Sequence, residues 1–418
     1  MATVLKNAWA LLFGVFLLML GNGLQGTLLG VRGDIEGFST NSMAWVMAGY
    51  FIGVLGGARL APEMIRRVGH VRVFAALASC ISACLILYAA VPNPFAWFAL
   101  RVAVGFCISG VYVVAESWLN DAATNETRGQ ALSAYVIVQM VGIVAAQLIL
   151  NVADPGGYTL FILISVLVSV AVAPILLSIN PAPVFHTTKP ITLRKLFEIS
   201  PLGIVGMFLL GGVFAALFGM AAVFGTVRGM NPREISVFVA TIYVGGLVAQ
   251  YPIGWLSDRM DRRILIVGVT LFGAMAAGAG VFFSGDFVFL LATALAIGGV
   301  ANPLYSLFIA YTNDFLDHED MAAAAGGMIL ANSIGAIAGP LIIGWLMTTF
   351  GANSFFAYIS ALLAAMSVYA VYRSTRRVSP NVDELTSYTP VVPTVSPVAV
   401  EVAQEVAIEQ AQDDRADG

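Results

Sequence analysis

The sequence reads Gly254-Trp255-Leu256-Ser257-Asp258-Arg259-Met260-Asp261-Arg262-Arg263 in a short polar turn between two apolar runs, residues 235–256 and 264–284. About 20 apolar residues cross the roughly 30 Å hydrocarbon core of a bilayer, so each run is long enough for a membrane-spanning helix. In the turn, Gly254 allows two helices to approach closely, and Asp258 places a carboxylate at a helix end. The basic residues that follow favour the cytoplasmic membrane surface. The stretch therefore predicts a helical hairpin in a membrane.

Lipid is the expected solvent for most of the protein surface. Of the 418 residues, 59 % are hydrophobic and 11 % are charged, whereas soluble globular proteins contain about 25 % charged residues. Apolar runs recur along the chain with regular breaks. We expect twelve membrane-spanning helices, at residues 8–30, 43–61, 72–91, 95–118, 130–151, 158–179, 202–226, 235–256, 264–284, 287–311, 324–349 and 354–372.

Lysine and arginine residues are distributed unevenly over the segments outside these runs. Up to residue 377, counting those at the adjoining run ends, fifteen lie on one side, and three, Arg32, Arg228 and Arg233, lie on the other side. Because cytoplasmic connections carry the excess of positive charge, we expect both chain ends to lie in the cytoplasm. The sequence thus predicts a multi-pass protein of the plasma (inner) membrane.

Two segments break the pattern of apolar runs. Residues 180–201 are polar and rich in proline, and they predict a cytoplasmic linker with a short amphipathic piece at 191–199. From residue 380 onward the chain contains eight acidic residues and one arginine, and it shows no sustained period, so 373–418 is expected to be a disordered cytoplasmic tail. The rest of the chain divides into residues 1–179 and 202–372, with six helices each.

The two six-helix units resemble each other in sequence. The first run closes with Gly30-Val31-Arg32-Gly33 and the seventh with Thr226-Val227-Arg228-Gly229. The fourth and tenth runs end with Asn120-Asp121 and Asn313-Asp314. Together these matches indicate a duplicated unit, and they predict two pseudo-symmetric six-helix bundles related by an axis along the membrane normal.

The turn at residues 254–263 resembles the G-x-L-x-D-R-x-G-R-R signature of the major facilitator superfamily, with Asp261 in place of the second glycine. The resemblance extends over residues 8–372 and implies the all-α fold of that superfamily. It also implies a cytoplasmic latch, in which Asp258 faces the start of the fifth helix in the other bundle. The alternative is that the turn only enforces orientation. The expected latch residues are Asp258, Arg259, Arg262, Arg263, Arg66, Arg67 and Arg128.

The fourth run carries a polar stripe that includes two charged residues. Arg101, Gly105, Ser109, Tyr112 and Glu116 fall within about 80° of one another on a helix, and such a stripe should face protein or water rather than lipid. Arg101 and Glu116 are about 22 Å apart along the axis, so each needs its own partner. Arg101 either holds an anionic solute or bonds its helix neighbours. Glu116 either pairs with Arg66, Arg67 or Arg72, which we favour, or carries a proton in a coupled cycle.

Amide and hydroxyl side chains mark the first and tenth runs as well. They either join helices through hydrogen bonds or line a central cavity, which we expect between the first, fourth, seventh and tenth runs. The seventh run contributes Phe214 and Phe218 but almost no polar group. The candidate substrate or coupling residues are Asn22, Gln25, Arg101, Tyr112, Glu116, Asn302, Tyr305 and Ser306.

Several short strings are similar to the YcaD-like branch of the superfamily. They include Glu116-Ser117-Trp118-Leu119-Asn120, Arg128-Gly129 and Asn313-Asp314. The resemblance implies a secondary transporter that moves a small solute by rocker-switch alternating access, with proton coupling as an open alternative. Two alternative hypotheses remain from the sequence. The protein is either a non-transporting sensor or receptor on the same fold, or a multidrug exporter.

Other classes of function find little support in the sequence. Cys80, Cys84 and Cys107 lie in apolar runs, the three histidines are far apart, and we expect neither a metal site nor a cofactor. The spans lack the paired acids or activated nucleophile of an enzyme. The sequence contains no string that resembles a nucleotide-binding loop, so we do not expect ATP to drive the protein. It also lacks the basic patch that nucleic-acid binding requires. We expect a monomer in the lipid bilayer. Its expected partner is a small solute, together with H⁺ if transport is coupled to protons.

Overall fold

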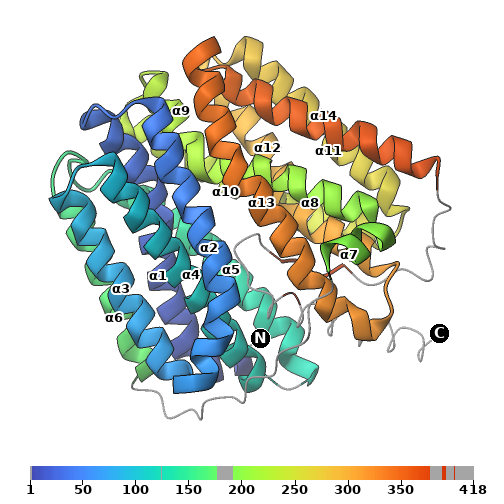
Figure 1. Ribbon diagram of the computed structural model, residues 1–418, viewed down its shortest axis with the longest axis horizontal. Coiled ribbons are helices and arrows are strands. Elements are labelled where there is room, and N and C mark those ends of the chain that lie inside the picture. Colours follow the sequence, from blue (N-terminus) through green and yellow to red (C-terminus); the bar gives the residue numbers. More distant parts are fainter. Residues whose placement is uncertain (1, 124, 177–191, 377–387, 392–399, 401–418) are drawn as a thin grey trace.

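The computed structural model describes residues 2–123, 125–176, 192–376, 388–391 and 400. These residues form helices and connections without a strand (Figure 1). The first bundle consists of α1 (Ala2–Ile35), α2 (Thr40–Val68), α3 (His70–Ala90), α4 (Pro94–Ala122), α5 (Asn125–Ile149) and α6 (Thr159–Leu176). The second consists of α8 (Pro201–Phe214), η1 (Ala215–Met220), α9 (Ala221–Val227), α10 (Pro232–Ser257), α11 (Arg262–Phe283), α12 (Phe287–Asn313), α13 (His318–Phe350) and α14 (Ser354–Ser374).

The predicted membrane-spanning helices are present. Within the described residues, 11 helices are long and apolar enough to cross a membrane, and α6 is a shorter apolar helix. The segments α8, η1 and α9 follow one another without a break and count as one span, Pro201–Val227. Together with α6, the described part of the chain therefore supplies the twelve helices that the sequence predicts.

Between the bundles, the structure describes the last part of the predicted linker. The short helix α7 (Leu193–Ile199) buries Leu196 and exposes an i,i+4 ion pair between Arg194 and Glu198. This helix lies where the sequence predicts an amphipathic piece. Residues 180–191 lie outside the described residues.

In the first bundle, α2 and α4 pack backbone against backbone. A Cβ atom at Gly53 would collide with the Val102 carbonyl oxygen of α4, and one at Gly105 would collide with the Tyr50 carbonyl oxygen of α2. Only glycine permits an approach this close, in the manner of small-residue contacts between membrane helices.

The second bundle repeats this packing between α10 and α12. A Cβ atom at Gly245 would collide with the Leu295 carbonyl oxygen, and one at Gly298 would collide with the Ile242 carbonyl oxygen. A reciprocal glycine pair thus joins the second and fourth spans of both bundles, at equivalent places. This repetition agrees with the duplicated unit that the sequence matches indicate.

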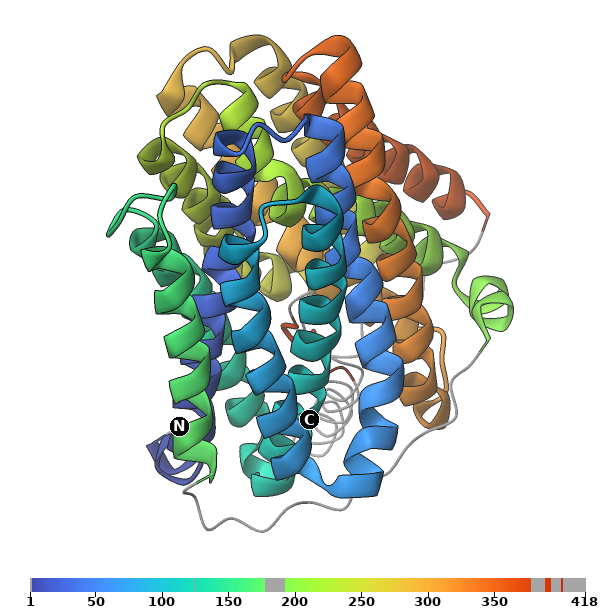
Figure 2. The same ribbon diagram turned by 60° about the vertical axis from the view of Figure 1, so that its left-hand side comes forward.

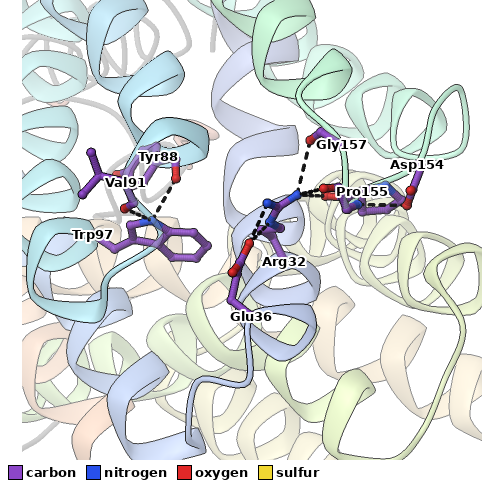
Figure 3. A network of polar contacts seen from close by, with 9 residues as sticks. Arg32, Glu36, Tyr88, Val91, Trp97, Asp154, Pro155 and Gly157 are labelled. Atoms are coloured by element: carbon purple, nitrogen blue, oxygen red, sulfur yellow. Dashed lines mark hydrogen bonds and ion pairs between the residues drawn. The ribbon is translucent and has the colours of Figure 1, made fainter.

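An arginine at the end of α1 fastens the loop between α5 and α6. The Arg32 guanidinium donates to the carbonyl oxygens of Pro155 (3.2 Å) and Gly157 (3.4 Å), and it forms an ion pair with Glu36 at 2.6 Å (Figure 3). We name this side of the molecule the Arg32 end. The opposite side, where the turn at residues 258–261 lies, is the Asp258 end.

The equivalent arginine of the second bundle also fastens a loop through hydrogen bonds. Arg228 donates to Asn353 Oδ1 (2.7 Å) in the loop between α13 and α14, and to the Ser284 carbonyl oxygen (2.8 Å) between α11 and α12. Each bundle therefore uses the arginine that ends its first span to fix the loop between its fifth and sixth spans.

The bundles contact each other at the Arg32 end. Thr348 Oγ1 of α13 donates to Asn41 Oδ1 of α2 (3.3 Å), and Asn151 Nδ2 donates to Ser236 Oγ of α10 (2.9 Å). From these contacts α2 and α13 diverge toward the Asp258 end (Figure 1). The molecule is therefore closed between its bundles at the Arg32 end.

Candidate functional site

A cavity of about 130 Å³ lies between the two bundles. Residues of α1, α4, α8 with η1, and α12 line it, and these are the spans that the sequence predicts. Residues of α2, α5, α10 and α13 line it as well. All the described spans that face the interface between the bundles thus contribute to one site.

Arg101 supplies the positive charge of this cavity. It is the only charged side chain among the described residues that line the cavity, and it is 4 % exposed. Its guanidinium carbon lies 4.7 Å from the centre of the Tyr50 ring, and Nη2 lies 3.4 Å from the Met47 sulfur. Its Nε atom is buried without a hydrogen-bond acceptor among the described residues. The guanidinium therefore retains a donor for a further ligand.

A small hydrogen-bond network joins three of the helices that surround Arg101. Asn22 Nδ2 of α1 lies 3.3 Å from the Tyr112 hydroxyl oxygen of α4. The Tyr50 hydroxyl of α2 lies 3.4 Å from Asn22 Oδ1. These contacts hold two phenol rings at the cavity wall, and the close glycine packing of α2 on α4 brings Tyr50 to Arg101.

Asn302 of α12 presents its amide on the opposite side of the cavity. Both Nδ2 and Oδ1 are buried without a hydrogen-bond partner among the described residues. Gly246 of α10 makes room for this side chain, since a Cβ atom there would collide with the amide. A buried amide without partners costs free energy of about 1–3 kcal/mol, and a ligand that pairs with it would recover that cost.

Aromatic rings form much of the remaining wall. Phe218 stacks on Tyr243 with ring centres 4.9 Å apart and on Phe214 at 5.4 Å. Tyr305 lies 6.0 Å from Phe214. Phe218 belongs to the π-helical segment η1, and such segments are frequent at functional sites. The wall therefore offers flat apolar surfaces near the Arg101 guanidinium and the Asn302 amide.

Three of the predicted residues lie away from the central cavity. Gln25 is 1 % exposed and its Nε2 atom donates to the Tyr88 hydroxyl (3.2 Å). Ser306 contacts the tail residue Val391. Glu116 accepts from the Tyr135 hydroxyl (2.9 Å), and it lines a second, smaller cavity together with Arg128. The structure thus brings together Asn22, Arg101, Tyr112, Asn302 and Tyr305.

The favoured pairing of Glu116 is absent. Arg66 and Arg67 form ion pairs with Glu63 on their own helix, at the protein surface. Among the described residues, none of Arg66, Arg67 and Arg72 contacts Glu116, which is 2 % exposed. The sequence reading was wrong here because the helix α2 carries its own carboxylate at the spacing that suits both arginines.

Four of the expected latch residues, Asp258, Arg259, Arg262 and Arg263, lie in or next to the turn that follows α10, whereas Arg66 and Arg67 lie on α2 and Arg128 lies on α5. Asp258 Oδ1 accepts the backbone N–H of Tyr388 (2.8 Å) and lies 3.6 Å from Arg262 Nη2. Burial raises the pKa of the Asp258 carboxyl above its ordinary value, while the Tyr388 N–H and the Arg262 and Arg259 charges lower it. In this conformation the carboxylate is therefore engaged by the tail.

The three arginines of the turn have different surroundings. Arg262 is 1 % exposed, donates to Ser257 Oγ (3.0 Å) and forms an ion pair with Asp314 at the end of α12. Arg263 pairs with Asp261 at 3.2 Å. Arg259 lies 4.5 Å over the Trp255 ring. Arg262 thus ties the turn to α12, and Arg259 remains at the surface.

Part of the tail lies against the second bundle. Residues 388–391, which we expected to be disordered, pack on α10 and α12, and Val391 is 1 % exposed. Tyr388 is buried, and this burial raises the pKa of its phenol. The sequence offers no periodic pattern there that could have revealed this contact.

Sequence reasoning also missed several cavity residues. They are Tyr50, Gln139, Tyr243, Asn332 and Ser333, which lie on α2, α5, α10 and α13. Each is a polar residue in a span that should face lipid or protein, and this is the signal that could have found them.

The sequence comparison identifies the family. The model of the Major Facilitator Superfamily matches residues 11–242 and 205–401. The chain therefore belongs to the Major Facilitator Superfamily, as the signature turn predicts.

Individual relatives are similar over most of their length. The chain is 26 % identical over 370 residues to the uncharacterized MFS-type transporter YcaD of Escherichia coli O139:H28 (strain E24377A / ETEC), covering 87 % of this chain and 94 % of that protein. The values are the same for YcaD of Shigella sonnei (strain Ss046). The resemblance to YcaD that the short strings indicate is confirmed.

Solved structures share the fold. A mutant of the nucleoside transporter NupG superimposes with a TM-score of 0.76 at 14 % identity, covering 88 % of this chain and 99 % of that chain. A second NupG structure gives a TM-score of 0.70 at 14 % identity, with 87 % and 98 % coverage. These structures show the fold, and the family match with the YcaD relatives identifies the protein as a multi-pass membrane transporter of the superfamily.

Proposed function

We propose that this protein is a secondary carrier that moves a small organic anion with a planar apolar part by alternating access. The observation that carries the proposal is the buried guanidinium of Arg101, whose Nε atom has no acceptor among the described residues. The cavity around it lies midway between the bundles, where carriers of this type bind their solutes.

The charge of Arg101 favours an anionic solute. An ionised group inside a membrane protein is costly unless a partner compensates it. The Tyr50 ring and the Met47 sulfur give Arg101 only weak partners. A carboxylate could accept two parallel N–H bonds from the guanidinium, and such charge-assisted bonds are stronger than neutral ones.

The opposite wall favours a flat solute with a hydrogen-bonding group. Phe218 and Tyr243 are stacked with their rings 19° apart, and Asn302 offers a donor and an acceptor without partners of their own. A solute that bridges Arg101 and Asn302 would contact both bundles. A solute bound in this way supports transport, because its binding can affect the relative position of the two bundles.

The proposed cycle exchanges contacts between the two ends. The bundles are in contact at the Arg32 end through Thr348 with Asn41 and Asn151 with Ser236. In the alternate state these contacts open and the Asp258 end closes. We propose that Asp258 then turns to the start of α5 near Arg128, where the positive end of the helix dipole favours a carboxylate by about 0.3–1 kcal/mol.

The charge distribution orients this cycle in the membrane. We propose that the Asp258 end is cytoplasmic, with both chain ends on that side, since the excess of lysine and arginine in the connections lies there. Residues 1–179 and 202–372 are the moving units, and residues 180–201 connect them. Reporter fusions at residues 1 and 418 test this orientation, and reporters on opposite faces would refute it.

Glu116 is the candidate for proton coupling, although it lies outside the solute cavity. Its buried carboxylate contacts the Tyr135 hydroxyl, and it shares the smaller cavity with Arg128 at the start of α5. A protonation change there would act on the helix that Asp258 approaches in the closed state. Under this proposal Glu116→Gln abolishes the pH dependence of transport while solute binding persists.

Binding and flux together test the proposed function. Purified protein is heated with a set of aromatic carboxylates, each matched with its primary amide, because a ligand that binds the folded state raises its stability. The carboxylates that bind are then loaded into proteoliposomes for counterflow. Preferred binding of carboxylates with counterflow is expected. Binding without any flux would instead indicate a sensor on the transporter fold.

A further inference from the structure

Tyr388 of the C-terminal tail is held by α10 through three different contacts. Its backbone N–H donates to Asp258 Oδ1 (2.8 Å), and its hydroxyl accepts from Gln250 Nε2 (3.1 Å). Its ring lies against Gly254, where a Cβ atom would come within 2.7 Å of it. The small residue of the signature turn thus makes room for a tyrosine of the same chain.

Val391 is held by α12. Its N–H donates to Ser306 Oγ (2.9 Å), and the Ser306 hydroxyl donates to the Val391 carbonyl oxygen (3.0 Å). Val391 and Val400 are both buried in the hydrophobic core, at 1 % and 0 % exposure. The described tail residues therefore behave as a bound peptide rather than as a solvated end, and they lie within the bundle outline (Figure 2).

These contacts lie on the faces of α10 and α12 that also line the central cavity. Ser306 follows Asn302 by four residues, and Gln250 follows Tyr243 by seven, so each pair shares a helix face. Asn302 and Tyr243 line the cavity. Ser306 is about 6 Å and Gln250 about 10 Å further along the helix axes toward the Asp258 end. The bound tail thus lies between the cavity and that end.

We infer that residues 388–391 are a tethered peptide ligand that occupies the Asp258-side mouth of the cavity and holds the carrier closed at the Arg32 end. The inference rests on the proposed transport function. Closing the Asp258 end requires the first bundle to approach the faces of α10 and α12 that the tail covers. It also requires Asp258 to release Tyr388 before it can reach α5.

The tether makes even weak contacts effective. Eleven residues connect Arg376, two residues after the end of α14, to Tyr388, and short connections give effective concentrations in the millimolar range. The segment can therefore occupy its site most of the time and still leave it during transport. In this view the tail slows the cycle without abolishing it.

Hydrogen exchange on the full-length protein tests the docking itself. The amide hydrogens of Tyr388 and Val391 should exchange at least about tenfold more slowly than in an unbound peptide, because both are hydrogen-bonded and buried. Tyr388→Ala removes the ring and the hydroxyl, and Val391→Pro removes the N–H that Ser306 accepts. Thr389→Ala is the matched control, since the Thr389 hydroxyl has no hydrogen-bond partner among the described residues.

A distance measurement tests the effect on conformation. Spin labels at positions 68 and 375, in a chain whose three cysteines are replaced, report the separation of the bundles at the Asp258 end; Val68 is exposed at the end of α2. Tyr388→Ala and Val391→Pro should add a population with a shorter distance and raise the counterflow rate about threefold or more, whereas Thr389→Ala should change neither.

The outcomes separate the two proposals. Rapid exchange of the 388 and 391 amides in the wild-type chain would overturn the inference, and so would label distances that are identical in all variants. Protected amides and shifted distances, with no solute moved by any variant, would support the docking and contradict the transport function.

Discussion

Replacing Arg101 by glutamine should selectively remove the affinity of the cavity for anions. The guanidinium is 4 % exposed, and its Nε atom has no acceptor among the described residues. A hydrogen bond to a charged group contributes about 1.5–3 kcal/mol, so the loss of one such bond weakens carboxylate binding by about 10- to 150-fold. The primary amides of the same ligands should lose less than about threefold, because a neutral partner gains little from the charge.

Thermal shift of the purified protein measures this loss. At a carboxylate concentration of 100 times the wild-type Kd, binding stabilises the wild type by about 2.7 kcal/mol. A 100-fold higher Kd in Arg101→Gln leaves about 0.4 kcal/mol at the same concentration, so the shift almost disappears. The control is Arg233→Gln, which removes an exposed arginine outside the cavity. An affinity for carboxylates that stays within about twofold in Arg101→Gln would refute the assignment.

Three further predictions concern stability. Gly53→Ala should lower the melting temperature by several degrees, because its Cβ would collide with the Val102 carbonyl oxygen. Gly268→Ala, whose Cβ would meet no atom within 4 Å, should leave the melting temperature unchanged or raise it. Equal melting temperatures of the two variants would contradict the backbone packing of α2 on α4. Arg262→Gln should destabilise the protein by about 3–5 kcal/mol, because it breaks the buried ion pair with Asp314. Arg259→Gln at the surface should change stability by less than about 0.5 kcal/mol, and denaturant unfolding compares the two variants. Burial raises the pKa of the Asp258 carboxyl in the folded protein, so above that pKa the ionised carboxylate lowers the stability of the fold. This loss of stability disappears as the pH falls through the raised pKa. Melting curves over acidic pH should therefore show the wild type gaining stability relative to Asp258→Asn, and a constant difference would count against the burial.

The fold was predictable because the physics of the bilayer acts on single segments. Each apolar run must satisfy its own backbone hydrogen bonds inside lipid, so run length alone predicts a helix. Arg32 and Arg228 could be matched in sequence, and both fasten the loop between the fifth and sixth spans of their bundles. Because both bundles use the same contact, the same short sequence pattern occurs in both halves of the chain, where it can be recognised without a structure.

The cavity was predictable only in part because it depends on how helices rotate against each other. Asn22, Arg101 and Asn302 stand out as polar residues in apolar runs, and all three line the cavity. Tyr50 reaches Arg101 because α2 and α4 touch at glycines, a pairing that the pattern of one helix cannot reveal. Glu116 shares the polar stripe of Arg101 but lies too far along the axis to share its cavity.

The docking of the tail left almost no signal in the sequence. Two of its contacts to the bundles use the backbone N–H groups of Tyr388 and Val391, which any residue except proline could supply. Gly254 suggested close helix packing, and its actual neighbour is a tyrosine ring from more than a hundred residues away.

The π-helical segment η1 has a consequence for how the seventh span can change. A π-helix accommodates an extra residue relative to the α-helix, so the side chains of α8 and α9 are out of phase by about 100° compared with a regular helix. If the hydrogen bonds of Ala215–Met220 returned to α-helical spacing, Phe218 inside this segment would shift relative to Tyr243, and α9 would rotate about the helix axis. Such a local change in helical pitch would alter one wall of the cavity without requiring either bundle to move as a whole.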